Sequence, residues 1–368
     1  MRFPASLPAL LGELVAIPSV TPCFDAGGSV PGEHAMGERV AELLAALGAD
    51  VSRQEVAHGR SNVIGRFMRR ADLPTIALVP HLDTVGVAGM TIAPFGAEIR
   101  EGRLYGRGAC DTKGPMAAAL WAVRTWCAQS NPQCNVVFAA TMGEEELSVG
   151  ASALCAAGFR ADFAVALEPT ELRVVHACKG VIRLWVEAQG RAAHGATPEA
   201  GVNAIYQLLP FLRACTDTLA PDFAARRHPV LGPASLNVGL VQGGRGLNVV
   251  PDLCTVGLDL RTHPNFSNDS ALAAVERAAN GLRVAVHGNG PSFALATDHP
   301  WVKRLARHAA GLTPVPWFSD ANILNAHGIP AVAFGPGSIA QAHTADEFIA
   351  LDSLEAGARA LAGFLTAS

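Results

Sequence analysis

The sequence predicts a mixed α/β protein in which a mostly parallel sheet is flanked by helices and a second, α+β domain is inserted. Three observations support this prediction. Buried-strand patterns alternate with helical patterns over residues 1–177, as in doubly wound sheets. The pattern changes to β-α-β-β-α-β over residues 178–291, the order of a split-βαβ domain. The α/β pattern returns over residues 292–368, which are therefore expected to complete the first domain.

The elements expected in the first domain follow from hydrophobic spacing. Apolar residues at i, i+3 and i+4 predict helices, and a continuous apolar run such as Ile76-Ala77-Leu78-Val79 predicts a buried strand. Pro18 and Gly48 mark the ends of the first two helices. The predicted helices cover 5–17, 34–48, 115–129, 151–157, 299–310 and a last helix from Leu351, and the predicted strands cover 61–67, 75–80, 135–141, 162–167 and 331–334.

The inserted domain has its own pattern. Apolar and polar residues alternate over 181–188, as in a half-exposed strand. A length of about 110 residues is ordinary for a domain. The remaining predicted elements are helices over 202–213 and 270–279 and strands over 234–241, 254–261 and 282–287.

Composition excludes several classes of function. The net charge of −4 argues against a nucleic-acid-binding surface or a polybasic membrane patch. No uncharged run reaches the roughly 18 apolar residues of a membrane helix, and Glu13 interrupts the first apolar stretch, so no secretion signal is expected. The eight cysteines form no CxxC pair and are expected to be reduced. A cytoplasmic enzyme, without membrane or nucleic-acid partners, is the expected class.

Two acidic motifs stand beside predicted turns in the first half of the chain. His81 and Asp83 follow a buried strand and point to the same side, and a metal-bound histidine usually donates its other N–H to a carboxylate. A surface histidine near an Asp cap is an equal alternative. Asp111 follows Gly106-Arg107-Gly108, but the third glycine of a dinucleotide fingerprint would fall on Asp111 itself. Taken alone, Asp111 is better explained as the cap of helix 115–129.

Further candidates follow other strands. Glu144-Glu145-Glu146 comes after strand 135–141, at the end where open α/β sheets bind ligands, although such runs are usually solvated. If a metal is present, one carboxylate can bind it while its neighbour takes a proton from water. Glu168 precedes Pro169 at the end of the next strand, and His343 lies in the loop 335–347. Singly, these two are better explained as a turn residue and a solvated histidine.

The joint arrangement changes this balance, because all these residues lie in loops of the same α/β layer. A set rich in carboxylates, poor in histidine and free of cysteine suits two divalent ions for hydrolysis, rather than a closed structural zinc site.

The chain resembles the co-catalytic zinc amidohydrolases, the family of acetylornithine deacetylase, succinyl-diaminopimelate desuccinylase, aminoacylase and carboxypeptidase G. The resemblance covers nearly the whole chain and implies a di-zinc aminopeptidase-like catalytic domain. The motifs that carry it are Leu14–Pro22, His81-x-Asp83, Gly106–Gly114, Glu144-Glu145, Glu168-Pro169-Thr170 and His343.

This resemblance implies a role for each motif residue. Gly150 lies five residues after the ligating Glu of the family, which selects Glu145 over Glu146 as the ligand. Gly143 departs from the family, which often has Asp before the Glu pair. By resemblance, His81 and Glu168 would hold one zinc, Glu145 and His343 the other, Asp111 would bridge both, Asp83 would orient His81, and Glu144 would be the general base.

The resemblance extends to the inserted domain, which it identifies as a dimerisation and lid domain. His194, in Gly190–Gly195, matches the histidine that reaches the partner subunit's active site and stabilises the tetrahedral oxyanion. Asn248 and Arg261 match residues lining the site for the substrate carboxylate, which a guanidinium can bind through both oxygens. Without the resemblance, a solvated His194 and a surface ion pair of Arg261 would be preferred.

The resemblance implies a homodimer with two Zn²⁺ per subunit, for which Co²⁺ can substitute. The segment Gly335–His343 is most similar to acetylornithine and acetylcitrulline deacetylases, although Ser319-Asp320-Ala321 is a form shared across the family. The expected reaction is the conversion of N2-acetyl-L-ornithine to ornithine and acetate, in arginine biosynthesis. Acetylcitrulline and succinyl-diaminopimelate remain alternative substrates. A non-catalytic dimeric binding protein is the alternative from another class, and the broken glycine fingerprint disfavours a nucleotide-binding enzyme.

Overall fold

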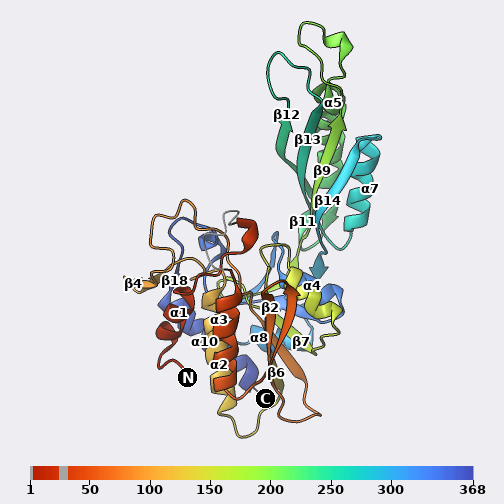
Figure 1. Ribbon diagram of the computed structural model, residues 1–368. Helices are drawn as coiled ribbons and strands as arrows, with labels where there is room; N and C mark the ends of the chain where they lie inside the picture. Colours follow the sequence, from red (N-terminus) through yellow and green to blue (C-terminus); the bar gives the residue numbers. More distant parts are fainter. Residues whose placement is uncertain (1–2, 25–31, 368) are drawn as a thin grey trace. The chain divides into compact units, whose positions relative to one another are not determined.

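The computed structural model describes residues 3–24 and 32–367 and divides the chain into two compact units (Figure 1). The first unit comprises Met1–His176, Leu295–Thr313 and Ser319–Ser368, and the second comprises Ala177–Ala294 and Pro314–Phe318. Each unit encloses its own hydrophobic core. The second unit is therefore an insertion that interrupts the first.

A nine-stranded sheet has its centre in the first unit, and its edge strand β15 belongs to the residue range Ala177–Ala294 of the second unit. Its strand order is β1-β2-β6-β3-β7-β17-β8-β15, and β16 also pairs with β8. The central strands β6, β3, β7 and β17 are parallel, and the strands on both sides pair antiparallel, so the predicted mixed α/β sheet is confirmed. The strands are β1 Asp50–Ala57, β2 Arg60–Phe67, β3 Thr75–Val79, β6 Asn135–Ala140, β7 Phe163–Ala166, β8 Arg173–Cys178, β15 Phe293–Ala294, β16 Gly311–Val315 and β17 Ala331–Ala333.

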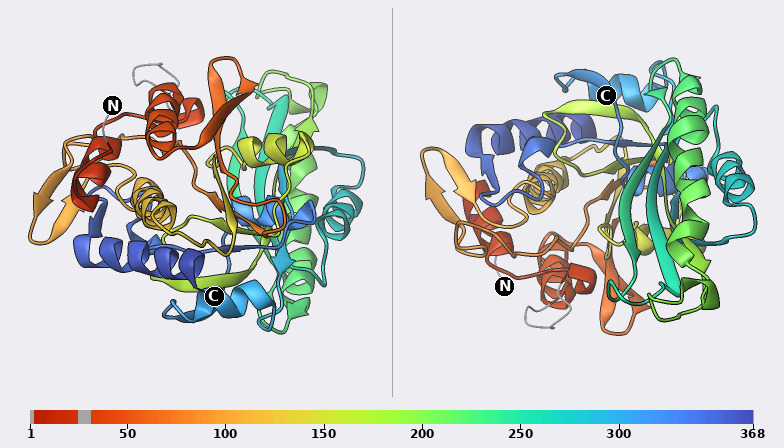
Figure 2. Two further views of the ribbon diagram at one scale, coloured as in Figure 1. Left: turned by 90° about the horizontal axis from the view of Figure 1, so that it is seen from below. Right: turned by 90° about the horizontal axis from the view of Figure 1, so that it is seen from above.

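Helices cover both faces of this sheet. The helices α1 (Leu7–Val15), α2 (His34–Ala46), α3 (Lys113–Cys127), α8 (Pro300–Ala306) and α10 (Leu351–Thr366) share one core. Figure 2 shows α3 and α10 side by side, golden and dark blue. The helices α4 (Val149–Ala156) and α9 (Asp320–Ala326) contact each other, and α9 contacts β7 and β17. Along β3, Ile76 and Leu78 enter the first core while their neighbours alternate to the other face.

Several elements were not predicted, because their sequences lack an apolar pattern. The edge strand β1 is mostly polar and has no fully buried residue, so no hydrophobic run marks it. A small separate sheet is built from β4 (Glu98–Arg100), β5 (Arg103–Tyr105) and β18 (Phe348–Ala350), which are too short to show a period. The predicted helix 115–129 begins two residues earlier, at Lys113, and the helix predicted over 299–310 ends at Ala306.

The second unit has the strand order β12-β13-β9-β14, with every neighbouring pair antiparallel. In chain order this is 2-3-1-4, in which β13 lies between the two strands of a βαβ unit, as expected for a split-βαβ domain. The helices α5 and α7 contact β9 and β13. The elements are β9 Gly180–Gln189, α5 Ala204–Ala214, α6 Ala220–Ala225, β10 Arg227–His228, β11 Gly232–Pro233, β12 Ser235–Gly243, β13 Leu253–Thr262, α7 Asn268–Ala279 and β14 Arg283–Gly290.

The parallel centre of the first sheet decides where the chemical side chains gather. The strands β3, β6, β7 and β17 end at one edge, and the segments that leave it carry His81, Glu144, Glu168 and His343. This edge is where open α/β sheets bind ligands. Within residues 3–24 and 32–367, none of the helices is both long and apolar enough to cross a membrane.

Candidate metal centre

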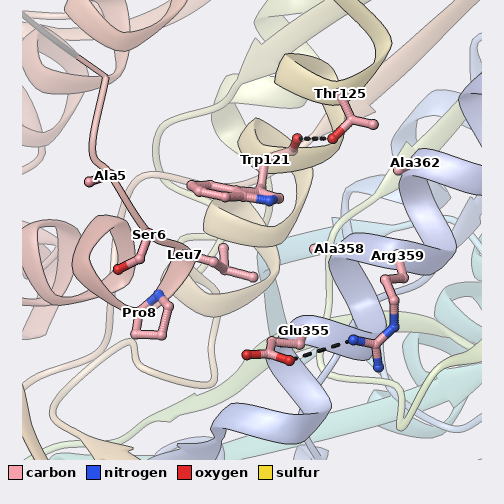
Figure 3. Close-up of a pocket in the computed structure, with 10 residues that line it drawn as sticks. All are labelled: Ala5, Ser6, Leu7, Pro8, Trp121, Thr125, Glu355, Ala358, Arg359 and Ala362. Carbon is pink, nitrogen blue, oxygen red and sulfur yellow. Dashed lines mark hydrogen bonds and ion pairs between the residues drawn. The ribbon is translucent and has the colours of Figure 1, made fainter.

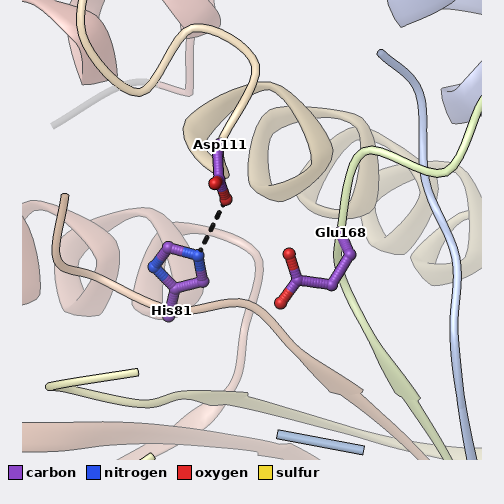
Figure 4. Close-up of side chains that lie close together, drawn as sticks. All are labelled: His81, Asp111 and Glu168. Carbon is purple, nitrogen blue, oxygen red and sulfur yellow. Dashed lines mark hydrogen bonds and ion pairs between the residues drawn. The ribbon is translucent and has the colours of Figure 1, made fainter. Parts of the chain in front are cut away.

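His81, Asp111 and Glu168 converge at the carboxyl edge of the sheet (Figure 4). Each offers one ligand atom, these atoms lie within 4.8 Å of one another, and all three residues are buried. His81 follows β3, Asp111 precedes α3 and Glu168 follows β7, so three separate elements supply the group.

A second group shares Asp111 with the first. Asp111, Glu145 and His343 also bring one ligand atom each within 4.8 Å. The two oxygens of Asp111 divide between the groups, because Oδ1 lies 3.2 Å from Nε2 of His81 and Oδ2 lies 3.4 Å from Nε2 of His343. His343 Nε2 is 2.9 Å from Glu145 Oε1, and its side chain is 51% exposed, so the second group opens to solvent. A carboxylate between two such groups has the geometry of a bridging ligand.

Asp83 contacts both His81 and the backbone of the turn that carries Glu144 and Glu145. Nδ1 of His81 lies 3.0 Å from the backbone carbonyl of Asp83 and 3.4 Å from its carboxylate. The two carboxylate oxygens accept the backbone N–H groups of Glu144 and Glu145, each at 3.0 Å. Asp83 therefore fixes the turn that carries both glutamates, a role that the spacing of His81 and Asp83 alone did not indicate.

The backbone of Gly150 lies very close to the backbone of Met142. A Cβ atom on Gly150 would lie 2.2 Å from the carbonyl oxygen of Met142, so only glycine fits there. Asn62 ties the two positions together, because its Oδ1 accepts the N–H of Met142 and its Nδ2 donates to the carbonyl of Gly150, both at 2.9 Å. The loop between Met142 and Gly150 is thereby closed at its base, with Glu145 near its tip.

The loop that carries Asp111 is organised by Glu347, which the sequence did not single out. The Glu347 carboxylate accepts the backbone N–H groups of Gly108, Cys110 and Asp111 at 2.9–3.0 Å. It also accepts Nη1–H of Arg107 at 2.7 Å, and both charged side chains are buried. The peptide bond between Asp111 and Thr112 is cis. Glu347 thus sets the backbone from which Asp111 projects.

Hydrogen bonds between the histidines and their carboxylate partners shift the pKa values of His81, His343 and Asp111. Burial alone would lower the pKa of His81, but hydrogen bonds to Asp111 and Asp83 outweigh it and hold the pKa well above its usual range. Burial alone would raise the pKa of Asp111, but hydrogen bonds from His343 and His81 hold it below its usual range. Hydrogen bonds to Asp111 and Glu145 raise the pKa of His343 to about 10. The site therefore stabilises positive charge on its imidazoles.

In the three glutamates the neutral form is favoured, because their pKa values are raised. Burial, followed by the charge of Glu168, raises the pKa of Glu144 well above its usual range. Burial and the charge of Asp111 do the same for Glu168, and burial raises the pKa of Glu145 as well. Carboxylates crowded in this way require nearby positive charge to remain ionised together.

Divalent cations fit this donor set. Carboxylate oxygens and imidazole nitrogens, without thiolate, are suited to Zn²⁺ and to neighbouring divalent ions. Two groups of three donors with one shared carboxylate match a pair of ions, and the clustered negative charge supplies the attraction. His81, Asp111 and Glu168 could hold one ion, and Asp111, Glu145 and His343 the other.

The residues predicted in the inserted domain lie at opposite ends of one strand. His194 bridges to Val249, and the N–H of Gly195 donates to the carbonyl of Asn248 at 2.7 Å, so His194 and Asn248 are neighbours before β13 begins. Both are exposed. Arg261, near the other end of β13, donates from Nε and Nη2 to Asp259 at 2.7 and 3.2 Å. Arg261 therefore does not join the other two within one copy of this unit.

A surface pocket elsewhere on the first unit carries different chemistry. It has a volume of about 510 Å³, lies among α1, α3 and α10, and is lined in part by Trp121, Glu355 and Arg359 (Figure 3). The last two form an exposed ion pair at 3.5 Å. The pocket shares no residue with the two donor groups, so it is separate from the candidate metal centre.

Residues 77–367 match the peptidase family M20/M25/M40, and this match covers more than half of the sequence. The chain belongs to this family, as its motifs indicated, and is a metal-dependent amidohydrolase.

Curated relatives align with the chain over most of their lengths. An acetylornithine deacetylase of Vibrio vulnificus is 29% identical over 377 residues, covering 96% of each chain. An acetylornithine deacetylase of Myxococcus xanthus is 32% identical over 298 residues, covering 76% of each chain.

Solved structures share the fold. A metallo-carboxypeptidase of Sulfolobus solfataricus has a TM-score of 0.83 at 17% identity and 97% coverage of both chains. A tripeptidase of Staphylococcus aureus has a TM-score of 0.75 at 24% identity, covering 98% of this chain and 97% of that one. A dinuclear metal-binding peptidase of Bacillus subtilis has a TM-score of 0.69 at 17% identity, covering 98% and 96%.

We predict that Glu347→Gln destabilises the first unit by about 3–5 kcal/mol, because it leaves the buried Arg107 guanidinium without its charge partner. Urea and thermal unfolding of the metal-free protein would measure the loss. Glu355→Gln is the matched control, since it removes an exposed pair with Arg359 and should cost at most about 0.5 kcal/mol. Equal unfolding midpoints for the two variants would contradict the organising role of Glu347.

Proposed function

We propose that the protein removes the acetyl group from N2-acetyl-L-ornithine by hydrolysis, yielding L-ornithine and acetate, with two zinc ions per subunit. The observation that carries the hydrolytic centre is the pair of donor groups that share Asp111. The substrate rests on the relatives named acetylornithine deacetylase, which align over 76–96% of this chain. Arginine biosynthesis is the pathway that this substrate implies.

The chain's own residues divide into those that hold metal and those that move protons. His81, Asp111 and Glu168 would hold one ion, and Asp111, Glu145 and His343 the other. When bound, divalent ions at these residues would supply a water of lowered pKa and polarise the amide carbonyl. The raised pKa of Glu144, caused first by burial, favours a carboxyl group that can both accept and return a proton. Glu144 would take the proton of the attacking water and deliver it to the leaving amine.

His194 would complete the site by donating a hydrogen bond to the oxyanion of the tetrahedral intermediate. Its Nδ1 accepts the N–H of Ala196 at 3.1 Å, so in the neutral ring Nε2 carries the proton and is the donor. Asn248, its neighbour, and Arg261 would contact the carboxylate of the substrate.

Strand length supports a homodimer for this arrangement. His194 pairs with Val249, which precedes the Leu253 end of β13. Arg261 is separated from Leu253 by most of this strand, about 25 Å at roughly 3.3 Å per residue. An N-acyl amino acid, about two residues in extent, spans less than ~10 Å. His194 and Arg261 can therefore contact the same substrate only if they come from two copies of the chain.

The surface of the second unit supports the same assembly. Strand β12 is at the edge of its sheet, with Leu240 and Val241 about half exposed and Leu247 fully exposed just beyond it. An exposed apolar edge strand favours pairing with another chain. The proposed homodimer forms through this inserted unit.

Turnover and metal binding should separate in two variants. Glu144→Gln should lower kcat by about 10²–10⁴-fold, the usual contribution of general acid–base catalysis, and keep its metal. Asp111→Ala should lose metal, because it removes the ligand common to both groups. Steady-state kinetics with elemental analysis would test this, and near-normal turnover of metal-loaded Glu144→Gln would refute the assignment of the base.

Substrate choice should be decided by a direct comparison of N2-acetyl-L-ornithine, N-acetylcitrulline and N-succinyl-diaminopimelate. We expect the highest kcat/KM for acetylornithine with the zinc-loaded enzyme. A preference above tenfold for either competitor would replace the proposed substrate and leave the amidohydrolase assignment in place.

Mixed dimers should recover activity from two inactive parents. His194→Ala supplies an intact Glu144, and Glu144→Gln supplies an intact His194, so a heterodimer contains one complete site if His194 acts across the interface. Random reassortment would restore about a quarter of wild-type sites. Heterodimers confirmed by native mass spectrometry that remain inactive would rule out action in trans.

A further inference from the structure

The turn that carries the catalytic glutamates is held from strand β2 by Arg60. We call Gly143–Glu146 the acidic turn. Arg60 donates from Nε and Nη2 to the two oxygens of Glu33, at 2.6 and 2.7 Å. Oε1 of Glu33 in turn accepts the backbone N–H of Gly143 at 3.0 Å. A bidentate ion pair is thus connected directly to the backbone at the start of the acidic turn.

The same guanidinium engages the third glutamate of the run. Nη1 of Arg60 donates to Oε2 of Glu146 at 3.0 Å, and Nη2 donates to the hydroxyl of Thr21 at 3.1 Å. The Thr21 hydroxyl hydrogen-bonds the other oxygen of Glu146. Both oxygens of Glu146 are therefore occupied, and neither group of metal-ligand donors includes Glu146.

The backbone of the acidic turn requires such support. Gly143 has φ +62°, and Leu147 and Ser148, which follow the turn, are non-glycine residues in the left-handed region at +67° and +58°. A Cβ on Gly143 would lie 2.6 Å from Cγ2 of Val149 and 3.3 Å from Nη2 of Arg60. Glycine at this position leaves the room that the guanidinium fills.

Resting on the proposed function, we propose that Arg60 is a positioning residue for the metal centre: it fixes the acidic turn through Glu33, so that Glu145 reaches Asp111, and it holds Glu146 out of the ligand set. Arginine suits this task because it has five donors and no acceptor, so it can hold carboxylates beside a metal without binding the metal. Its planar fork contacts Glu33 and Glu146 at once, which a lysine ammonium cannot reproduce.

Low exposure strengthens the contact. The Glu33 side chain is 1% exposed and that of Arg60 is 15% exposed, so solvent screens their attraction weakly. A comparable bidentate pair on the neighbouring strand, Arg53 with Glu38 at 2.8 and 2.8 Å, is 45% exposed on both sides. Arg53 thus binds a glutamate in the same way as Arg60 does, but in contact with solvent, and provides a matched control.

The test is a titration of metal-free protein with Co²⁺, followed by visible absorption, for wild type, Arg60→Met and Arg53→Met. Partners that orient metal ligands typically contribute 10–100-fold to metal affinity, so Arg60→Met should weaken Co²⁺ binding by about that factor and change its spectrum. Arg53→Met should stay within about twofold of wild type. A folded Arg60→Met variant with wild-type affinity and spectrum would overturn the proposal.

Two further variants keep the proposal testable. If Arg60→Met does not fold, Arg60→Lys replaces it and should bind Co²⁺ at least about threefold more weakly, since the fork is lost; unchanged affinity would overturn the proposal. Glu146→Gln should keep its affinity within about threefold, because Glu146 is not a ligand. A loss larger than this in Glu146→Gln would overturn the exclusion of Glu146 from the ligand set.

Kinetics then separate positioning from substrate binding. In Arg60→Met, kcat should fall at least about tenfold while KM changes less than about threefold, because ground-state binding of the substrate is retained. A loss confined to KM would contradict the proposal. Since the cobalt titration uses no substrate, a wild type that binds Co²⁺ but leaves acetylornithine intact would refute the proposed substrate and not the role of Arg60.

Discussion

The candidate metal centre depends on one buried carboxylate, Glu347, which is not itself among the donors. It binds three backbone N–H groups of the loop that ends at Asp111, together with Arg107. Glu347 lies just before β18 and α10, whereas Asp111 lies just before α3, and α10 packs along α3. The contact therefore joins two segments 236 residues apart in sequence at the point where both enter the helical layer. The position of Asp111, and with it the sharing of one carboxylate by two histidines, follows from this contact.

The parallel centre of the sheet explains why so many carboxylates can be collected in one place. The strands β3, β6 and β7 end at one edge, so short segments suffice to bring His81, Glu145 and Glu168 together. Mutual repulsion opposes this collection, as the raised pKa values of the glutamates show, with burial as their first cause. Asp83 adds a further carboxylate, which is stabilised by the backbone N–H groups of Glu144 and Glu145 and thereby holds the acidic turn in place.

The sequence predicted the parts of this arrangement that have a local signal. Buried strands were visible as apolar runs, and most of the donors stood out because they follow one of them, whereas Asp111 follows a glycine-rich turn. The roles of Glu347 and Arg60 had no such signal, because their partners are distant in the chain and a lone Glu or Arg is usually solvated. The second role of Asp83 was hidden for the same reason, since its acceptors face N–H groups 61 and 62 residues away. Strand β1 was not predicted because most of its residues are polar and none is fully buried, as an edge strand allows.

Two arginines, Arg107 and Arg60, serve the two halves of the centre in the same way. Each pairs with an almost fully buried glutamate, Glu347 or Glu33, that also accepts backbone N–H from a loop bearing a candidate metal ligand. Neither a guanidinium nor a backbone N–H has a lone pair to offer a cation, so these anchors oppose carboxylate repulsion without competing for metal. A lysine could lose its proton and become a ligand, whereas arginine remains charged. A carboxylate-rich centre supported in this way can keep its shape before a metal ion binds.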